Sequence, residues 1–361
     1  MDNIKISVIL PVYNAEKTIS RTITSIINQN YDNYELIVIN DGSTDNSAKI
    51  CKGFLEKNPK IKYIELENNG VSNARNCGIK NSTGDYIMFI DSDDEYTSIA
   101  LQTVIEKLQE DTTLELIAFS YERIHINTNK VKIMHTNNIE IKEGNNKNIF
   151  IEKLQRQCLF NQIWNKVFKR DVLNGSSVEF DVTVSSGEDY KFNIQYIDLI
   201  KNAIYIDKVL YKYYSGVEGL SLKTGPEKIY VKIRNLNEHK KLYEKMNYDI
   251  TYIDNSYVYT CLSGLTAMKV KDNSKKTTEY FRKYINNEDI RKELNEIRKR
   301  SKSLKIKLCI RILTIKHVFI LKAVVNVLSI TRIIYRKIRL GWNGNLFDFI
   351  SCHNNISSFI R

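Results

Sequence analysis

The sequence predicts an α/β protein with a doubly wound, mostly parallel sheet, followed by a helical C-terminal region. Two observations lead to this fold class. Short apolar runs rich in β-branched residues alternate with segments in which apolar residues recur at helical spacing. Each of these runs also ends in a polar loop. Strands that alternate with helices form parallel βαβ units with right-handed crossovers, and such sheets bind ligands beyond the carboxyl ends of their strands.

The strands are expected where apolar runs are short and bounded by turn residues. The first covers residues 4–10 and stops at Pro11. The others are expected at residues 35–40, 61–66, 86–90, 114–124, 130–134 and 203–214. Residues 138–150 are polar and are expected to be irregular.

The helices are expected between these strands. In residues 16–29, four isoleucines (19, 23, 26 and 27) lie at helical spacing. Further helices are expected to begin at Ser43 or Thr44, at Gly70, at about Thr97 and at Ser185 or Ser186. From about Pro226 the pattern becomes helical, which predicts a small helical subdomain.

Charge is distributed unevenly along the chain. The net charge is +12, and residues 291–361 contain 16 Lys or Arg against 3 Asp or Glu, a balance of +13. The other 290 residues therefore carry 12 − 13 = −1. This asymmetry indicates an anionic surface as the partner of the tail alone.

Cysteine usage and the first residues bear on the compartment. The six cysteines are scattered, with no C-x-x-C pair and no neighbouring histidine cluster. This argues against a zinc site or a disulfide framework and favours a reducing cytosol. The opening has an acid at position 2, a single Lys before the apolar run and no small-residue cleavage site, unlike a signal peptide. We therefore expect a cytoplasmic location.

A cluster of acids follows the run at residues 86–90. Asp91, Asp93 and Asp94 come directly after it, with Glu95 beyond. Carboxylates gathered at the end of a buried strand suit a hard cation such as Mg²⁺ or Mn²⁺, which would neutralise a diphosphate. The alternative is a solvated helix N-terminus, where acids are also favoured.

Three loops are expected at one edge of the sheet, at residues 11–15, 41–45 and 91–94. Besides the acids they offer the ring of Tyr13 and the carboxylate of Asp41. Taken singly, Tyr13 could be a rim aromatic and Asp41 a turn residue before a glycine; their joint occurrence favours a ligand site. Neither G-x-G-x-x-G nor G-x-x-x-x-G-K-[ST] follows these strands, which argues against a dinucleotide oxidoreductase and a P-loop NTPase.

Four motifs in order resemble the nucleotide-binding half of the family 2 glycosyltransferases, which have the GT-A fold. They are SVILPVYNAEKTI, ELIVINDGSTDNS, NNGVSNARNCGI and GDYIMFIDSDDEY, and the resemblance is dense over about residues 4–96. It implies a nucleoside diphosphate sugar as donor, most often UDP-linked. The residues that it implies at the donor are Pro11, Tyr13, Asn14, Asp41, Arg75, Asp91, Ser92 and Asp93.

The resemblance also implies individual roles. Tyr13 would lie against the uracil face, and Asp41 would accept a hydrogen bond from the uracil N3–H. Arg75 would lie near the donor, and Asp91 would contact ribose or sugar hydroxyls. Asp93 would bind Mn²⁺ or Mg²⁺, with Asp91 as the second candidate ligand. The chain departs from the pattern at residue 40, where Asn replaces the first of two acids, but in the family the second acid meets the base.

The second half of the predicted catalytic domain offers an acceptor residue and a base. Trp164 lies in a stretch that resembles the segment before the family's acceptor-binding residues, and its alternative is a core anchor. Glu188 and Asp189 fall in the first turn of a predicted helix, where they could simply cap it. The resemblance implies a general base in this pair, with Asp189 the first choice. Residues 215–224 resemble a loop that closes over the diphosphate, although Val217 and Glu218 replace the usual His or Arg.

In the tail, apolar residues alternate with Lys and Arg between residues 298 and 342. The longest charge-free stretch of its apolar part, Ala323 to Thr331, has nine residues, whereas a membrane span needs roughly 17–25. We expect a basic amphipathic helix on an anionic membrane, with Arg332, Arg336 and Arg339 on one face. Packing against the protein is the first alternative. Nucleic acid is not expected, because no recognised binding module accompanies the charge.

The predicted organisation is a GT-A catalytic domain (1–225, with halves 1–105 and 106–225), a helical subdomain (226–297) and a basic tail (298–361). The predicted function is inverting, metal-dependent sugar transfer from a UDP-linked donor to a saccharide acceptor. The acceptor is expected to be lipid-linked, in bacterial capsule, lipopolysaccharide or other surface-glycan synthesis at the inner face of the membrane. The alternatives are a sugar nucleotidyltransferase, whose Gly-rich loop is missing here, and a non-catalytic membrane-associated adaptor.

Overall fold

The computed structural model describes residues 4–184, 187–216, 227–267, 275–325 and 327. The chain divides into two compact units, Met1–Glu218 and Gly219–Arg361. Residues 217–224 of the predicted loop at 215–224, and the predicted arginine face at 332–339, lie outside the described residues.

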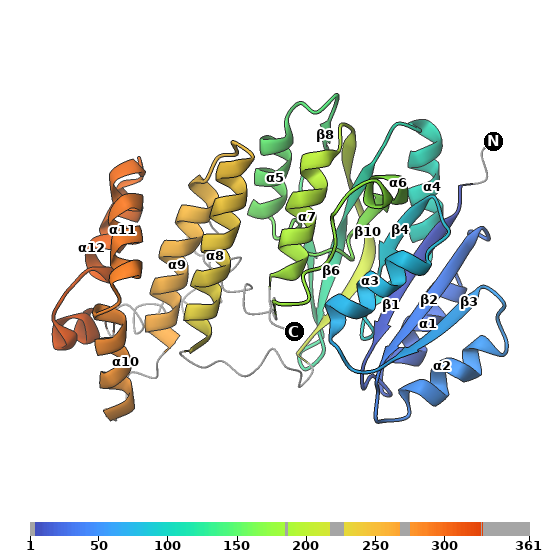
Figure 1. The fold of residues 1–361 in the computed structure, drawn as a ribbon, viewed down its shortest axis with the longest axis horizontal. Coiled ribbons are helices and arrows are strands. Elements are labelled where there is room, and N and C mark those ends of the chain that lie inside the picture. The colour runs from blue at the N-terminus through green and yellow to red at the C-terminus, as the bar shows by residue number, and fades with distance from the viewer. Residues whose placement is uncertain (1–3, 185–186, 217–226, 268–274, 326, 328–361) are drawn as a thin grey trace. The chain divides into compact units, whose positions relative to one another are not determined.

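The first unit is built on a ten-stranded sheet in the order β3-β2-β1-β4-β9-β6-β10-β5, with β7 paired to β6 and β8 to β10 (Figure 1). The strands are β1 (Ile6–Val12), β2 (Tyr34–Asp41), β3 (Ile61–Leu66), β4 (Tyr86–Phe89), β5 (Glu95–Tyr96), β6 (Leu116–His125), β7 (Lys130–Met134), β8 (Ile139–Ile141), β9 (Lys166–Lys169) and β10 (Ala203–Ser215). Its helices are α1 (Ile19–Ile27), α2 (Ser47–Leu55), α3 (Val71–Asn81), α4 (Ala100–Glu110), α5 (Lys147–Arg156), α6 (Arg170–Asn174) and α7 (Glu188–Leu199).

The first four long strands form the parallel βαβ units that the sequence predicts. β1 lies between β2 and β4 and is parallel to both, and β2 is parallel to β3. The chain therefore leaves β1 toward one side and returns to its other side with β4. This reversal is a topological switch point, the place where open α/β sheets bind ligands. The carboxyl ends of β1 and β4 meet there.

The other half of the sheet is mixed, not parallel throughout. The short strand β9 is antiparallel to both of its neighbours, β4 and β6, whereas β6 and β10 are parallel. Two further differences from the sequence predictions are local. β1 runs through Pro11 to Val12; its pairing with β4 ends at Ile9, so the missing amide of Pro11 interrupts no ladder on that side. Residues 138–150, predicted to be irregular, contain β8 and the start of α5.

An aromatic core joins β4, β9 and α7. Phe89, Phe168 and Phe192 pack edge to face, with ring centroids 5.4–6.1 Å apart. Phe180 stacks on Phe192 at 4.2 Å. Such aromatic pairs stabilise a fold by about 0.5–1.5 kcal/mol beyond their buried area. They fix α7, whose first turn carries Glu188 and Asp189, against the strand that leads into the acidic loop.

The second unit is helical among its described residues. Its helices are α8 (Glu227–Lys245), α9 (Thr251–Ala267), α10 (Lys275–Ile285), α11 (Glu288–Arg300) and α12 (Leu304–Leu313), followed by a helical segment at 318–325. The predicted boundary between residues 297 and 298 falls inside α11. Buried residues on both sides of it, from Ile229 to Val325, belong to one hydrophobic cluster. Within the described part of the chain, no helix is both long enough and apolar enough to span a bilayer.

Candidate active site

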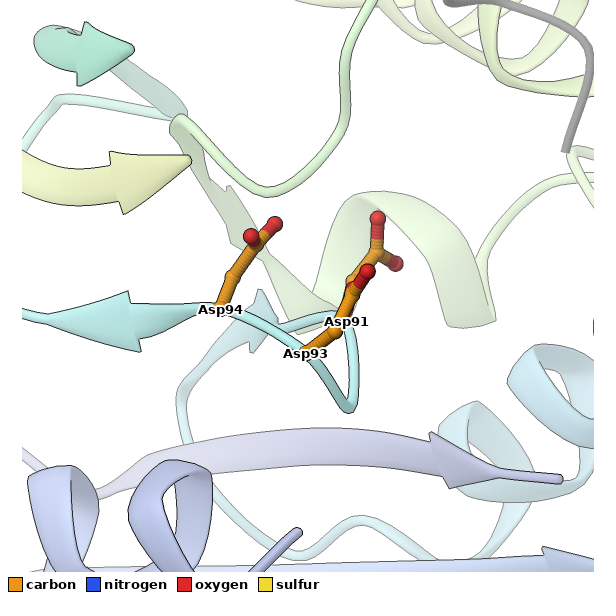
Figure 2. A group of neighbouring side chains, drawn as sticks. All are labelled: Asp91, Asp93 and Asp94. Carbon is orange, nitrogen blue, oxygen red and sulfur yellow. The ribbon is translucent and has the colours of Figure 1, made fainter. Parts of the chain in front are cut away.

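The acidic loop lies between β4 and β5, at the switch point. Asp91, Asp93 and Asp94 project from it, and each offers a carboxylate oxygen within 4.8 Å of the others (Figure 2). Asp91 and Asp93 are partly exposed, whereas Asp94 is fully buried. The three acids are therefore neighbours, but they do not have equal access to a ligand.

The backbone of this loop is fixed by side chains of the first helix. The hydroxyl of Thr18 donates to the carbonyl of Ser92 at 2.8 Å, and that of Thr22 to the carbonyls of Ser92 and Asp94 at 3.0 and 2.8 Å. Arg21 Nη2 donates to the carbonyl of Asp93 at 2.6 Å. Sequence reasoning missed these residues. The available signal was a polar stripe at positions 18, 22 and 25, on a helix whose other face is isoleucine.

Asp94 ties the loop to β10. Its carboxylate accepts hydrogen bonds from the Tyr211 hydroxyl at 2.9 Å and from the backbone amide of Tyr214 at 2.8 Å. A buried carboxylate is stable only when it is hydrogen-bonded or paired, and these donors satisfy that need. Asp94 is thus a structural anchor. Asp91 and Asp93 remain as the acids placed to meet a ligand.

The carboxylate oxygens of the acidic loop suit a hard divalent cation. Carboxylate oxygens are the ligands that Mg²⁺ and Mn²⁺ prefer, and the loop presents them at close range without a nearby thiolate or imidazole among the clustered residues. Asp93 and Asp91 are the residues that would hold such an ion.

The loops after β1 and β2 are joined to each other by Asn14. Its backbone is left-handed (φ 49°), a conformation that Asn tolerates, and its side-chain oxygen accepts from the Thr44 amide at 2.8 Å. The backbone N–H of Asn14 donates to Ser43 Oγ at 3.1 Å. The neighbouring Tyr13 is 47% exposed. Its ring is therefore available to a flat ligand, while Asn14 shapes the loop beneath it.

Asp41, predicted to accept a hydrogen bond from uracil, is buried and already accepts hydrogen bonds from the backbone. It is 4% exposed, and its two oxygens accept from the backbone amides of Asn69 and Gly70 at 3.0 and 2.9 Å. These bonds hold the turn that opens α3, where Gly70 has φ 89°. Each carboxylate oxygen can accept two hydrogen bonds, so these bonds do not exclude a further one from uracil. The contact between Asp41 and uracil stays a prediction.

Arg75 gathers three acids around one guanidinium. This side chain, 5% exposed, lies on α3. Nη1 lies 2.8 Å from Asp189 Oδ1 and 3.5 Å from Glu188 Oε1, and Nη2 lies 3.1 Å from Asp91 Oδ1. The candidate general base, Asp189, and the acid predicted to contact the sugar donor, Asp91, therefore contact the same guanidinium. The helix that carries the candidate base begins at Glu188 after Gly187; the serines predicted to cap it lie outside the described residues.

The surroundings of Asp189 shift its titration toward neutral pH. Burial raises the pKa of its carboxyl; Arg75 opposes the shift, and the nearby carboxylates of Glu188 and Asp91 add to it, with a net rise to about 8. A general base works best when its pKa lies near the operating pH. The role of Asp189 as a general base stays a prediction.

Trp164 lies in a stack of rings on the β10 side. It is 5% exposed, stacks on Tyr211 at 4.3 Å and on Tyr213 at 5.6 Å, and meets Tyr121 edge to face at 4.7 Å. This packing satisfies the alternative in which Trp164 is a core anchor. Its role toward an acceptor stays a prediction.

The geometry can now be set beside known proteins. Residues 7–175 match the model of Glycosyl transferase family 2. The glycosyltransferase GlyA of Streptococcus pneumoniae is 32% identical over 254 residues, which is 68% of this chain and 36% of GlyA. The minor teichoic acid biosynthesis protein GgaA of Bacillus subtilis is 34% identical over 201 residues, 52% of this chain and 42% of GgaA. The chain thus spans well under half the length of either relative.

Solved structures agree on the fold. TarS 1–349 of S. aureus, in complex with UDP-GlcNAc, superposes with a TM-score of 0.63 at 18% identity, covering 89% of this chain and 90% of that one. A mannosyltransferase of Pyrobaculum calidifontis, in complex with GDP-Man and Mn²⁺, gives 0.50 at 14% identity, covering 90% and 86%. The chain belongs to the family 2 glycosyltransferases. The GT-A fold that the motifs implied is confirmed.

Proposed function

We propose that the protein is an inverting sugar transferase that uses a UDP-linked donor and a divalent cation. The observation that carries the proposal is the arrangement around Arg75, which brings Asp91 from the acidic loop and Asp189 from α7 to the same guanidinium. Inverting transfer needs a base on the side of the acceptor and charge neutralisation on the side of the leaving group. Asp189 is our candidate for the base, and the acidic loop is our candidate site for the neutralising cation.

On the side of the sugar donor, we assign the exposed ring of Tyr13 to the face of the uracil. We assign Asp91 to ribose or sugar hydroxyls. Mn²⁺ or Mg²⁺ held by Asp93 and Asp91 would supply Lewis-acid neutralisation of the diphosphate. In support, the mannosyltransferase neighbour is described in complex with Mn²⁺, and the TarS neighbour with UDP-GlcNAc.

On the acceptor side, Asp189 takes the proton of the attacking hydroxyl. Its Oδ1 accepts from Arg75, so we assign proton transfer to Oδ2. The acceptor oxygen then bonds to the anomeric carbon as the bond to the UDP oxygen breaks, and the configuration inverts. No covalent bond to the protein forms. A base placed in this way contributes typically about 10²–10⁴-fold to the rate.

We place the reaction in bacterial surface-glycan synthesis, with a saccharide acceptor carried on a lipid. GgaA, a teichoic acid biosynthesis protein, supports this context. The protein would be cytoplasmic and would associate peripherally with the inner face of the membrane through residues 298–342. The nucleotidyltransferase and adaptor alternatives have no observation in their favour.

The test is an assay of UDP release across a panel of UDP-sugars with Mn²⁺, with saccharide acceptors from surface glycans. The anomeric configuration of the product is then read by NMR. A product that retains the configuration of the donor would refute the inverting mechanism, and failure to bind any UDP-sugar would refute the donor assignment.

A further inference from the structure

The last described helices of the second unit carry apolar side chains that the unit does not bury. Every large hydrophobic residue that is exposed in its described part lies between residues 304 and 327. They are Leu304 (83% exposed), Leu308 (58%), Phe319 (68%), Ile320 (54%) and Val327 (60%). A soluble protein scatters exposed apolar residues singly, whereas a gathered set marks a contact surface.

In the helix at 318–325 and the described residue Val327, two opposite sides carry apolar side chains. Leu321 and Val325 are fully buried in the cluster that the helices of this unit share. At 100° per residue, Phe319, Ile320 and Val327 fall on the opposite side, and only the small Ala323 stands between them. The buried face accounts for the folding of the segment. The outer face is not buried: its three apolar side chains are 54–68% exposed, although the ring of Phe319 lies 5.9 Å from that of His317.

In α12 the exposed apolar residues have cations on both sides. Ile306, Ile310 and Leu313 are buried, and Leu304 and Leu308 project from the other face. The same helix carries three cations, Lys305, Lys307 and Arg311, on positions beside those leucines. This is the arrangement of a helix that lies in a membrane interface, apolar side chains inward and cations toward headgroups.

The charge around these faces has one sign. Residues 301–327 contain six Lys or Arg (302, 305, 307, 311, 316 and 322) and no Asp or Glu. The cations just before them are already paired, Lys299 with Glu296 and Arg300 with Asp254. Protein–protein contact surfaces are poor in Lys, so an apolar face among lysines fits an anionic lipid layer better than a protein partner.

We propose that two exposed helix faces, one with Leu304 and Leu308 and the other with Phe319, Ile320 and Val327, dock on an anionic lipid bilayer. The apolar side chains enter the interface to a depth of about 5–10 Å, and the flanking cations contact the headgroups. This inference rests on the peripheral association proposed above and assigns it to particular side chains. It is independent of sugar transfer.

The test uses the full chain without donor, mixed with vesicles of phosphatidylglycerol and phosphatidylcholine or of phosphatidylcholine alone. The unsubstituted protein should sediment with the anionic vesicles only. Phe319→Ser with Ile320→Ser should weaken that binding about tenfold or more. Val131→Ser with Ile133→Ser, which removes similarly exposed side chains (57% and 53%) from β7, is the matched control and should bind normally.

A second set of variants tests the charge. Replacing Lys305, Lys307 and Arg311 by Gln should weaken binding about a hundredfold, because each charge near an anionic leaflet contributes about fivefold. The control replaces Lys49, Lys57 and Lys80, exposed cations of the first unit, with Gln. Far-UV circular dichroism should be unchanged in all variants, because none of the substituted side chains is buried; thermal unfolding checks whether loss of the contact between Lys305 and the Tyr259 ring lowers stability.

A gain of signal complements these losses. Phe319→Trp should become quenchable by brominated anionic lipid, whereas Val131→Trp should not. Normal vesicle binding by both test sets would overturn the assignment to these faces while peripheral association stands. An unsubstituted protein that ignores anionic vesicles would overturn both. A dimer that Phe319→Ser with Ile320→Ser dissociates, with vesicle binding intact, would show a contact between copies of the chain instead.

Discussion

Arg75 and Asp189 lie 114 residues apart in the sequence, and their side chains form an ion pair of 2.8 Å between Nη1 and Oδ1. The same guanidinium contacts Asp91 through Nη2. Because a guanidinium is planar and presents donors in a fixed fork, it can hold two carboxylates at a set separation. The relative position of the donor-side acid and the candidate base is thus determined by one buried residue.

Arg75→Lys should lower kcat about a hundredfold while the affinity for UDP changes little. A lysine keeps the charge but has one nitrogen, so it cannot bridge Asp91 and Asp189 in the same geometry. Steady-state kinetics and calorimetry with UDP measure the two effects. Arg156→Lys, on the exposed face of α5, is the matched control. A rise in KM for the donor with unchanged kcat would instead make Arg75 a donor ligand only.

Asp189→Asn should lower the rate of transfer by about 10²–10⁴, because the amide cannot take the acceptor proton. Calorimetry should find UDP binding close to that of the unsubstituted protein. Glu188→Gln is the neighbouring comparison and should retain most of the activity. If transfer survives in the first variant and disappears in the second, the base is Glu188.

The pH dependence follows from the raised pKa of Asp189, about 8. Only the unprotonated carboxylate accepts a proton, so kcat/KM for the acceptor should fall about tenfold for each pH unit below that value. Because Glu188 raises the pKa of Asp189, Glu188→Gln should move this acid limb to lower pH. A pH–rate profile at saturating donor measures the shift, and a limb at the same pH in both proteins would assign it to another group.

Asp93→Ala should abolish the part of UDP binding that depends on Mn²⁺, measured by calorimetry with and without the ion. Asp94→Asn is the comparison that distinguishes loss of metal binding from loss of stability. Since Asp94 is buried and hydrogen-bonded to β10, its substitution should lower the free energy of unfolding by about 1–3 kcal/mol. Binding of UDP with Mn²⁺ that is undiminished in Asp93→Ala would remove the metal assignment.

Glu35→Gln should destabilise the first unit by about 2 kcal/mol at neutral pH. Burial alone would raise the pKa of Glu35, but bonds from Lys62, Ser7 and Thr83 lower it to about 2. Its contribution is therefore present above its ordinary value of 4.5 and is lost as the pH falls from about 4.5 toward 2. Denaturant unfolding at several pH values measures this loss.

The variant should show a flatter dependence than the unsubstituted protein across that pH window. Glu65→Gln, which removes an exposed pair with Lys52, should change stability by less than about 0.5 kcal/mol and is the control. Equal acid sensitivity of Glu35→Gln and the unsubstituted protein would contradict the prediction.

The parallel half of the sheet could be predicted from the sequence because each strand is a distinct apolar run between helical patterns. The antiparallel strand β9 could not. It has four residues, KVFK, and two of them are lysines, so neither its length nor its pattern separates it from a loop. Its place between β4 and β6 comes from tertiary packing of Val167 and Phe168, which no local signal records.

The site was predictable as a set of residue types and not as a set of contacts. Asp91, Asp93 and Asp94 are equivalent in the sequence, and only the hydrogen bonds from β10 distinguish Asp94 as a structural acid. In the same way, the family resemblance implied a place for Arg75 near the donor, but the pairing of Arg75 with Asp189 depends on where α7 packs. Side-chain partners that come from distant elements are fixed by the three-dimensional fold.

The hydrogen bonds between Asp94 and β10 attach the acidic loop to the end of that strand, so a shift of one displaces the other. Tyr214 reinforces the link, since its hydroxyl donates to Glu95 at 2.7 Å and its ring lies under Arg21. A substitution at Tyr211 or Tyr214 will therefore also displace the loop that carries Asp91 and Asp93, the candidate ligands of the cation.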